Sequence, residues 1–186
     1  NKQFKKILAA ILEIVKSVFI HLSGRFNNIA FKIVGGYFSI SGLANIMSKE
    51  WVLAKELEDL KTFDIGIMPM PENEWTLGKC GFKAILYMSM SIPCVCSPVG
   101  ANKEIVTDGL NGFLANTEEE WIKKLSFLIE SSQLRKKIGL EGRKTIEQNY
   151  SVKINAPKFL QAIQQVSPVN KKKESSNVRN LRNYKL

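Results

Sequence analysis

EWTLGKCGFKAILYMSMSIPCVCSPVGANKEIVT, the segment from Glu74 to Thr107, decides the fold class of this 186-residue chain. It follows the apolar run 64–68 and is read in order as a glycine-containing loop, a helix, a short strand, a second loop and a helix. Strands that alternate with helices predict a parallel sheet. Lys79 and Lys83 stand where the first loop becomes a helix, and the free N–H groups of a helix start attract phosphate. We therefore expect a phosphate-bearing ligand at this junction.

The same alternation extends outward over most of the chain. Expected helices cover 3–22, 54–63, 80–91, 102–106, a segment capped by Thr117, 132–148 and 151–164. Expected strands cover 31–36, 46–51, 64–68, 93–97 and 112–115. This order predicts an α/β fold, a Rossmann-like doubly wound parallel sheet with helices on both faces. Ligands of such sheets bind at the carboxyl ends of the strands, so the loops 70–82 and 97–102 are the expected walls of one cleft.

Charge separates the chain into two parts. The net charge is +10, and half of it lies in residues 166–186, which are rich in Lys, Arg, Ser and Asn and poor in apolar side chains. We expect one domain over 1–165 and a basic, disordered tail over 166–186. Such a tail is either a solvated end or a contact for anionic lipid or nucleic acid. No aromatic-basic interleaving or nucleic-acid-binding motif appears, so no specific nucleic acid is expected.

The reactive side chains are few. Cys80, Cys94 and Cys96 are an odd number, which argues against a disulfide framework or a zinc site and suits a reducing cytoplasm. Cys94 and Cys96 alternate on an expected strand and so face one side, as core thiols would. The single histidine, His21, has no evident catalytic partner in the sequence.

The first expected helix carries one apolar stripe. The stripe consists of Ile7, Ile11, Ile14, Val18 and Leu22. It fits a helix that packs on a sheet, and an interfacial membrane helix is the alternative. Charged residues interrupt the segment, so it is not expected to span a bilayer.

From about Phe31 to Ile163 the chain resembles the carboxyl-terminal, donor-binding domain of a GT-B glycosyltransferase of family 4. The motifs that carry the resemblance are FKIVGG at 31–36, DIGIMP at 64–69, GKCGFK at 78–83, IPCV at 92–95, SPVG at 97–100, NKEIV at 102–106 and DGLNGFL at 108–114. The resemblance implies a nucleotide-diphosphate sugar as donor and no metal or other cofactor. It also implies a preceding domain that binds the acceptor, and a first strand that this chain does not contain.

The resemblance also assigns the site. Many family members have two glutamates around this helix start, at positions that correspond to Gly78 and Leu86 here. A subgroup has the helix start Gly-Lys-Cys-Gly-x-Lys instead, which this chain shares. The implied phosphate ligands are Lys79 and Lys83, which also stabilise the leaving group, together with the backbone around Cys80, Gly81 and Phe82. Further implied donor contacts are Glu74, Trp75, Pro98 and Gly100.

The implied reaction is transfer of a sugar to an acceptor glycan or lipid-linked glycan in surface polysaccharide assembly. The expected location is the cytoplasm, with peripheral contact at the inner membrane face. Without its acceptor domain the chain is expected to be inactive. A non-catalytic Rossmann-like domain that binds a nucleotide or a protein partner is the alternative.

Overall fold

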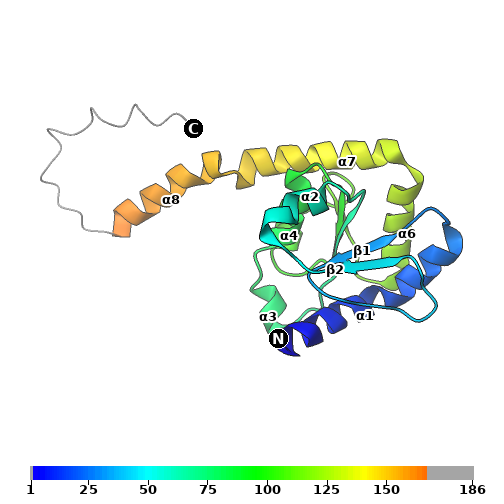
Figure 1. The fold of residues 1–186 in the computed structure, drawn as a ribbon. Helices are drawn as coiled ribbons and strands as arrows, with labels where there is room; N and C mark the ends of the chain where they lie inside the picture. The colour runs from blue at the N-terminus through cyan, green and yellow to red at the C-terminus, as the bar shows by residue number, and fades with distance from the viewer. Residues whose placement is uncertain (1, 167–186) are drawn as a thin grey trace, which may run out of the picture. The chain divides into compact units, whose positions relative to one another are not determined.

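The computed structural model describes residues 2–166. The chain divides after Tyr150 into two compact units, which are described separately here (Figure 1). The first contains all of the strands, and the second contains one helix among the described residues. The predicted tail over 166–186 lies outside the described residues, apart from Val166. No helix in the described range is both long and apolar enough to cross a membrane.

All strand pairs of the first unit are parallel, as predicted. β1 (Phe31–Val34) pairs with β2 (Ile46–Lys49), and Phe31 lies opposite Ile46. β3 (Gly66–Met68) pairs with β4 (Cys94–Cys96), which pairs with β5 (Phe113–Leu114). The strands thus form a two-stranded and a three-stranded sheet, where the sequence predicted one continuous sheet. The α/β, Rossmann-like class is confirmed, and the absent first strand stays a prediction.

Helices connect the strands and end the unit. They are α1 (Lys2–Arg25), a 3-10 turn at Leu53–Lys55, α2 (Glu56–Leu60), α3 (Glu74–Leu77), α4 (Phe82–Ser89), α5 (Asn102–Ile105), α6 (Glu118–Glu130), α7 (Ser132–Thr145) and a π-helical turn at Ile146–Tyr150. The predicted capping box of α6 is present, since Glu120 N–H donates to Thr117 Oγ1. The sequence did not predict α3, which interrupts the loop 70–78.

The larger core lies where α1 and α6 meet the sheets. Val18 and Leu22 of α1 are buried, together with Trp121 and Leu125 of α6. Phe19 stacks on the ring of Phe31, with 4.0 Å between ring centroids. Val18 and Leu22 of the predicted stripe therefore pack in the core, and Ile14 packs against it, which favours this role over an interfacial membrane helix.

A second core lies under α4 and contains the strand thiols. Met88 of α4, Cys94 and Cys96 are all fully buried, which confirms that the two cysteines are core residues. Burial and a hydrogen bond with Cys94 raise the pKa of the Cys96 thiol, the hydrogen bond being the larger cause. α7 packs closely against the turn at Ser91, because a Cβ on Gly139 would lie 2.0 Å from the Ser91 carbonyl oxygen.

The sequence places Leu57 and Leu60 on one side of the helix at 54–63 and Asp59 on the other, and this prediction is partly wrong. Leu57 is exposed, whereas Asp59 is buried. Asp59 Oδ1 accepts hydrogen bonds from Lys49 Nζ at 2.8 Å and Lys32 Nζ at 2.9 Å. These bonds lower the pKa of the Asp59 carboxyl, with the Lys49 bond as the largest cause. Because two lysines neutralise it, this carboxylate can replace an apolar side chain at a buried position.

The second unit begins at Ser151 and contains α8 (Val152–Val166). The sequence predicted this helix and included it in a single domain over 1–165, a boundary that stays a prediction. α8 has Pro157 in its interior and no buried residue.

Candidate functional site

The two loops expected to line the site pack directly against each other. Met70 N–H donates to the Ser97 Oγ at 2.9 Å, which ties the end of β3 to the end of β4. Gly100 has a φ of +54°, and a Cβ there would lie 2.9 Å from the carbonyl oxygen of Leu77. A side chain at position 100 would therefore separate the loops. The loops form one continuous wall at the carboxyl ends of β3 and β4.

α3 gives the first of these loops a fixed shape. Asn73 caps it, since its Oδ1 accepts from the Thr76 N–H at 3.0 Å. The buried Thr76 hydroxyl donates to the Pro71 carbonyl oxygen at 2.6 Å. This anchoring leaves Glu74 and Trp75 exposed on the outer side of the turn.

Gly81 forms the start of α4. Its φ of +67° lies in the left-handed region, and its carbonyl oxygen accepts the Ile85 N–H at 3.2 Å. A residue with a Cβ would be strained at this φ, and its Cβ would also displace Ile105 Cδ1, which lies 2.4 Å from that position. Within the described residues, the N–H groups of Phe82, Lys83 and Ala84 have no acceptor. They form the positive end of the helix dipole and are available to an anion.

The two lysines of the motif add positive charge to this helix start. Lys79 Nζ lies 3.6 Å from the centroid of the Trp75 ring. Lys83 is in the first turn of α4, where the helix dipole disfavours a cation. Its pKa is lowered, first by desolvation from the surrounding protein atoms and then by the charge of Lys79, while Glu56 raises it. Glu56 offsets this positive charge only in part, and a bound anion would offset more of it.

Two residues near the helix start were not predicted from the sequence. Glu56 of α2 acts on Lys83 and accepts a hydrogen bond from Trp51 Nε1 at 3.0 Å. No local signal identifies it, because its role depends on a contact between distant segments. Asn102 of α5 is fully buried and donates through Nδ2 to the Ser97 carbonyl oxygen at 3.0 Å. Its Oδ1 has no partner in the described range and lies 3.1 Å from where a Cβ of Gly81 would be. In the sequence, its only signal was that of a polar residue directly after the loop that contains Gly100.

The remaining predicted donor contacts vary in exposure. Cys80 and Phe82 are exposed beside the lysines, with 60% of the Phe82 surface accessible. Pro98 is half-buried in the second loop. The structure thus gathers the predicted residues of 74–83 around one helix start, with Gly100 in the adjoining loop.

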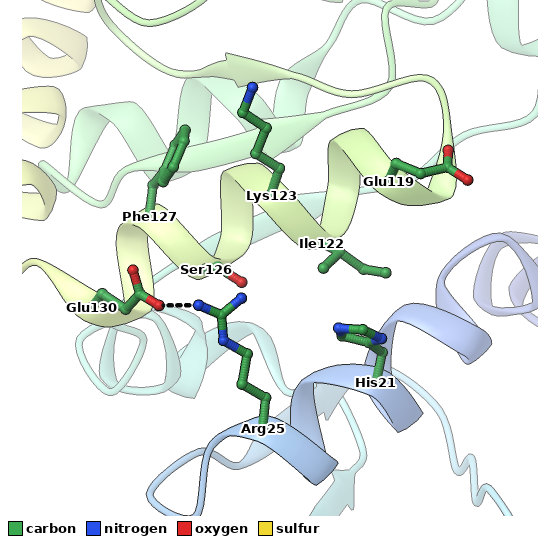
Figure 2. A pocket seen from close by; sticks show the side chains of 8 residues that line it. All are labelled: His21, Arg25, Glu119, Ile122, Lys123, Ser126, Phe127 and Glu130. Atoms are coloured by element: carbon green, nitrogen blue, oxygen red, sulfur yellow. Dashed lines mark hydrogen bonds and ion pairs between the residues drawn. The ribbon is translucent and has the colours of Figure 1, made fainter.

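Two hollows of the surface lie away from the motif lysines. One, of about 370 Å³, is bounded by α1 and α6 (Figure 2). Arg25 of α1 and Glu130 of α6 form an ion pair across it at 2.6 Å, and His21 lies on the α1 side (Figure 2). Another is near the amino ends of β3 and β4 and is lined by Asp64 and Pro93. Neither of these two hollows is lined by the motif lysines. In the range that the structure describes, no group of His, Cys, Asp and Glu could hold a metal ion.

Comparison with solved structures shows the same fold in several proteins. The carboxyl-terminal domain of the group 1 glycosyl transferase LpcC from Francisella tularensis is 23% identical, with a TM-score of 0.51 over 58% of this chain and 55% of that one. HepE from Anabaena, solved with UDP and glucose, is 14% identical, with a TM-score of 0.67 over 82% of this chain and 45% of HepE. TarM from S. aureus, solved with UDP among its ligands, is 17% identical, with a TM-score of 0.65 over 81% of this chain and 32% of TarM.

This chain therefore spans between about a third and just over half of the length of these three relatives. At these identities the structures show a shared fold, the carboxyl-terminal half of a GT-B enzyme. No curated protein matches the chain. The family model described as glycosyl transferases group 1 matches residues 2–131, which is more than half of the chain. The chain belongs to the group 1 glycosyl transferase family.

Proposed function

We propose that this chain is the donor-binding half of a glycosyltransferase, which binds the diphosphate of a nucleotide sugar at the start of α4. The observation that carries the proposal is a set of three N–H groups, on Phe82, Lys83 and Ala84, that have no acceptor in the part of the chain that the structure describes. The lysines at 79 and 83 stand beside them. Desolvation and, second to it, the charge of Lys79 lower the pKa of Lys83, so a bound diphosphate would favour the charged form of Lys83. HepE and TarM, which share the fold, were solved with UDP.

The chemistry follows from the charge that grows on the leaving group. When the bond from the sugar to the diphosphate breaks, negative charge builds up on the phosphate oxygens. N–H groups that are already oriented, and lysines that are already close, stabilise this charge without reorganisation. Gly81 allows the phosphate to approach the backbone. This electrostatic role assigns leaving-group stabilisation to Lys79 and Lys83 and calls for no metal.

The acceptor side of the reaction belongs to a second domain. We assign the acceptor, a glycan or a lipid-linked glycan, to an amino-terminal domain that completes the active site. Surface polysaccharide assembly in the cytoplasm, at the inner membrane face, is the role that suits such an acceptor. Support comes from the relatives, whose chains are about two to three times the length matched here.

The test is a thermal-shift panel on the protein at its full natural length, with UDP-, GDP-, ADP- and CDP-glucose. A nucleotide at 100 times its Kd stabilises the folded state by ~2.7 kcal/mol. One of the four should raise the Tm, and Lys79→Ala and Lys83→Ala should each reduce the shift. Lys123→Ala is the matched control, because Lys123 also lies over an aromatic ring, that of Phe127, but is on α6.

Donor hydrolysis separates catalysis from binding alone. Release of free nucleotide from the stabilising donor should be slow but measurable, and both lysine variants should slow it further. No shift with any of the four donors would contradict the proposal. A shift with unchanged hydrolysis in both variants would favour the alternative, a non-catalytic nucleotide-binding domain.

A further inference from the structure

The Asn102 side chain lies between the loop after β4 and the start of α4. Its Nδ2 donates to the Ser97 carbonyl oxygen at 3.0 Å, in the loop that begins where β4 ends. A carbonyl oxygen can only accept, so the amide nitrogen faces Ser97 and the amide oxygen faces the opposite way. In that direction lies Gly81, because Oδ1 is 3.1 Å from the position that a Cβ of Gly81 would occupy. One amide group thus spans the two loops of the candidate site.

The amide oxygen of Asn102 has no hydrogen-bond donor in the part of the chain that the structure describes, although the residue is fully buried. Such an oxygen has given up water without a replacement, which is unfavourable. Asn111, an equally buried asparagine, shows the usual arrangement. Its Oδ1 accepts the Thr107 N–H at 2.7 Å, and its Nδ2 donates to the Ile105 carbonyl oxygen at 3.1 Å. The unpaired oxygen at position 102 therefore calls for a role besides packing.

The start of α4 supplies an electrostatic partner for this oxygen. The free N–H groups that follow Gly81 make the region positive, and the negative end of the Asn102 amide dipole is directed at it. Gly81 also packs against the Cδ1 of Ile105 and the Cβ of Ala101. The start of α4 thus rests on the segment 101–105, and the Asn102 amide links that segment to Ser97.

We propose that Asn102 is a positioning residue of the diphosphate site: its amide fixes the start of α4 against the loop after β4, so that the free N–H groups are oriented before the ligand binds. The inference rests on the proposed function for the identity of the ligand. N–H groups that are oriented in advance stabilise an anion without reorganisation. Gly81 can adopt many conformations, so without the amide its turn would have to be ordered when the ligand binds, and affinity would fall.

The first experiment measures the Kd of inorganic pyrophosphate by calorimetry on the full-length protein. Asn102→Ala should weaken binding by about three- to tenfold, the size expected when a short segment must be ordered on binding. Asn111→Ala is the matched control, because it removes an equally buried amide whose bonds go to Thr107, Ile105 and Thr145, outside α4. Both variants should lower the Tm, but only the change at position 102 should alter the Kd.

Asn102→Asp adds a readout that a purely structural role would not move. A protonated carboxyl has the shape of the amide, with an O–H to donate to Ser97 and an oxygen to face Gly81. The ionised carboxyl has no donor, and its charge opposes the diphosphate. Burial raises the pKa of a carboxyl, so the ratio of the variant's Kd to the parent's should be large at about pH 8 and approach one at about pH 5. Dividing by the parent's Kd removes the titration of pyrophosphate itself, and Asn111→Asp should give a ratio that does not change with pH.

The proposal is overturned if Asn102→Ala binds pyrophosphate like the parent, or if Asn111→Ala weakens binding equally. It is also overturned if the ratio for Asn102→Asp does not depend on pH, and this series decides alone if the alanine variant does not fold. Absence of pyrophosphate binding in the parent would contradict the proposed function and this inference together. Normal binding in the parent and in every Asn102 variant would contradict this inference alone.

Discussion

The ammonium of Lys79 lies 3.6 Å from the ring centroid of Trp75, so a lysine proposed to bind phosphate rests on an aromatic face in the unliganded chain. An exposed cation–π contact of this kind contributes ~0.5–1 kcal/mol. A charge-assisted hydrogen bond to phosphate contributes more, about 1.5–3 kcal/mol. A bound diphosphate can therefore draw Lys79 away from the ring, at a cost equal to the lost contact.

The Trp75→Leu substitution removes that cost. Affinity for inorganic pyrophosphate, measured by calorimetry, should rise by about two- to fivefold, the equivalent of ~0.5–1 kcal/mol. Pyrophosphate is the right probe because it has no base to stack on Trp75. The gain should vanish when Lys79→Ala is already present, and Phe127→Leu, which removes the ring beneath Lys123, should have no effect. Unchanged or weaker pyrophosphate binding in Trp75→Leu would show that the ring does not compete for Lys79.

Lys83 predicts a pH dependence of donor binding. Its pKa is lowered by desolvation and by the charge of Lys79, so its ammonium deprotonates at a lower pH than the ordinary lysine value of ~10.4. Only the charged form attracts a diphosphate, so affinity should be full below the lowered pKa and fall as pH rises through it. Lys83→Arg keeps its charge over this range. When Kd is measured against pH, the arginine variant should therefore show no loss of affinity on the alkaline side. An identical alkaline decline in both proteins would assign the titration to another group.

The fold was predictable because its signals are local. The apolar runs that form β3 and β4 end at Pro69 and Ser97. The spacing of Thr117 and Glu120 predicted the start of α6. What the sequence did not predict depends on contacts between residues that are far apart along the chain. Asp59 appeared to face solvent because its partner Lys32 is 27 residues away. Glu56 influences Lys83 from another helix, a contact that no periodicity encodes.

The three cysteines should differ in reactivity. Cys80 is exposed beside the proposed phosphate site, whereas Cys94 and Cys96 are buried, and the pKa of Cys96 is raised. A thiolate is the reactive form, so the native chain should react with Ellman's reagent at one thiol of the three and at all three in denaturant. Cys80→Ser should remove the native reaction. A stabilising nucleotide should slow labelling of Cys80, and labelling at an undiminished rate with the site saturated would place the nucleotide away from this loop.

Gly139 provides the sharpest test of the packing between α7 and the segment that precedes β4. A Cβ at this position would lie 2.0 Å from the Ser91 carbonyl oxygen, and this oxygen is backbone and cannot rotate away. Gly139→Ala must therefore shift α7 or the turn at Ser91, at a cost of about 1–3 kcal/mol or more for overpacking. Gly24→Ala is the control within a helix, because nothing lies within 4 Å of its added Cβ. That change should stabilise the chain by up to about 1 kcal/mol. Urea unfolding, followed by tryptophan fluorescence, measures the stability of both variants, since Trp121 is buried in the folded chain. Equal stability of the two variants would mean that α7 does not pack against Ser91 in solution.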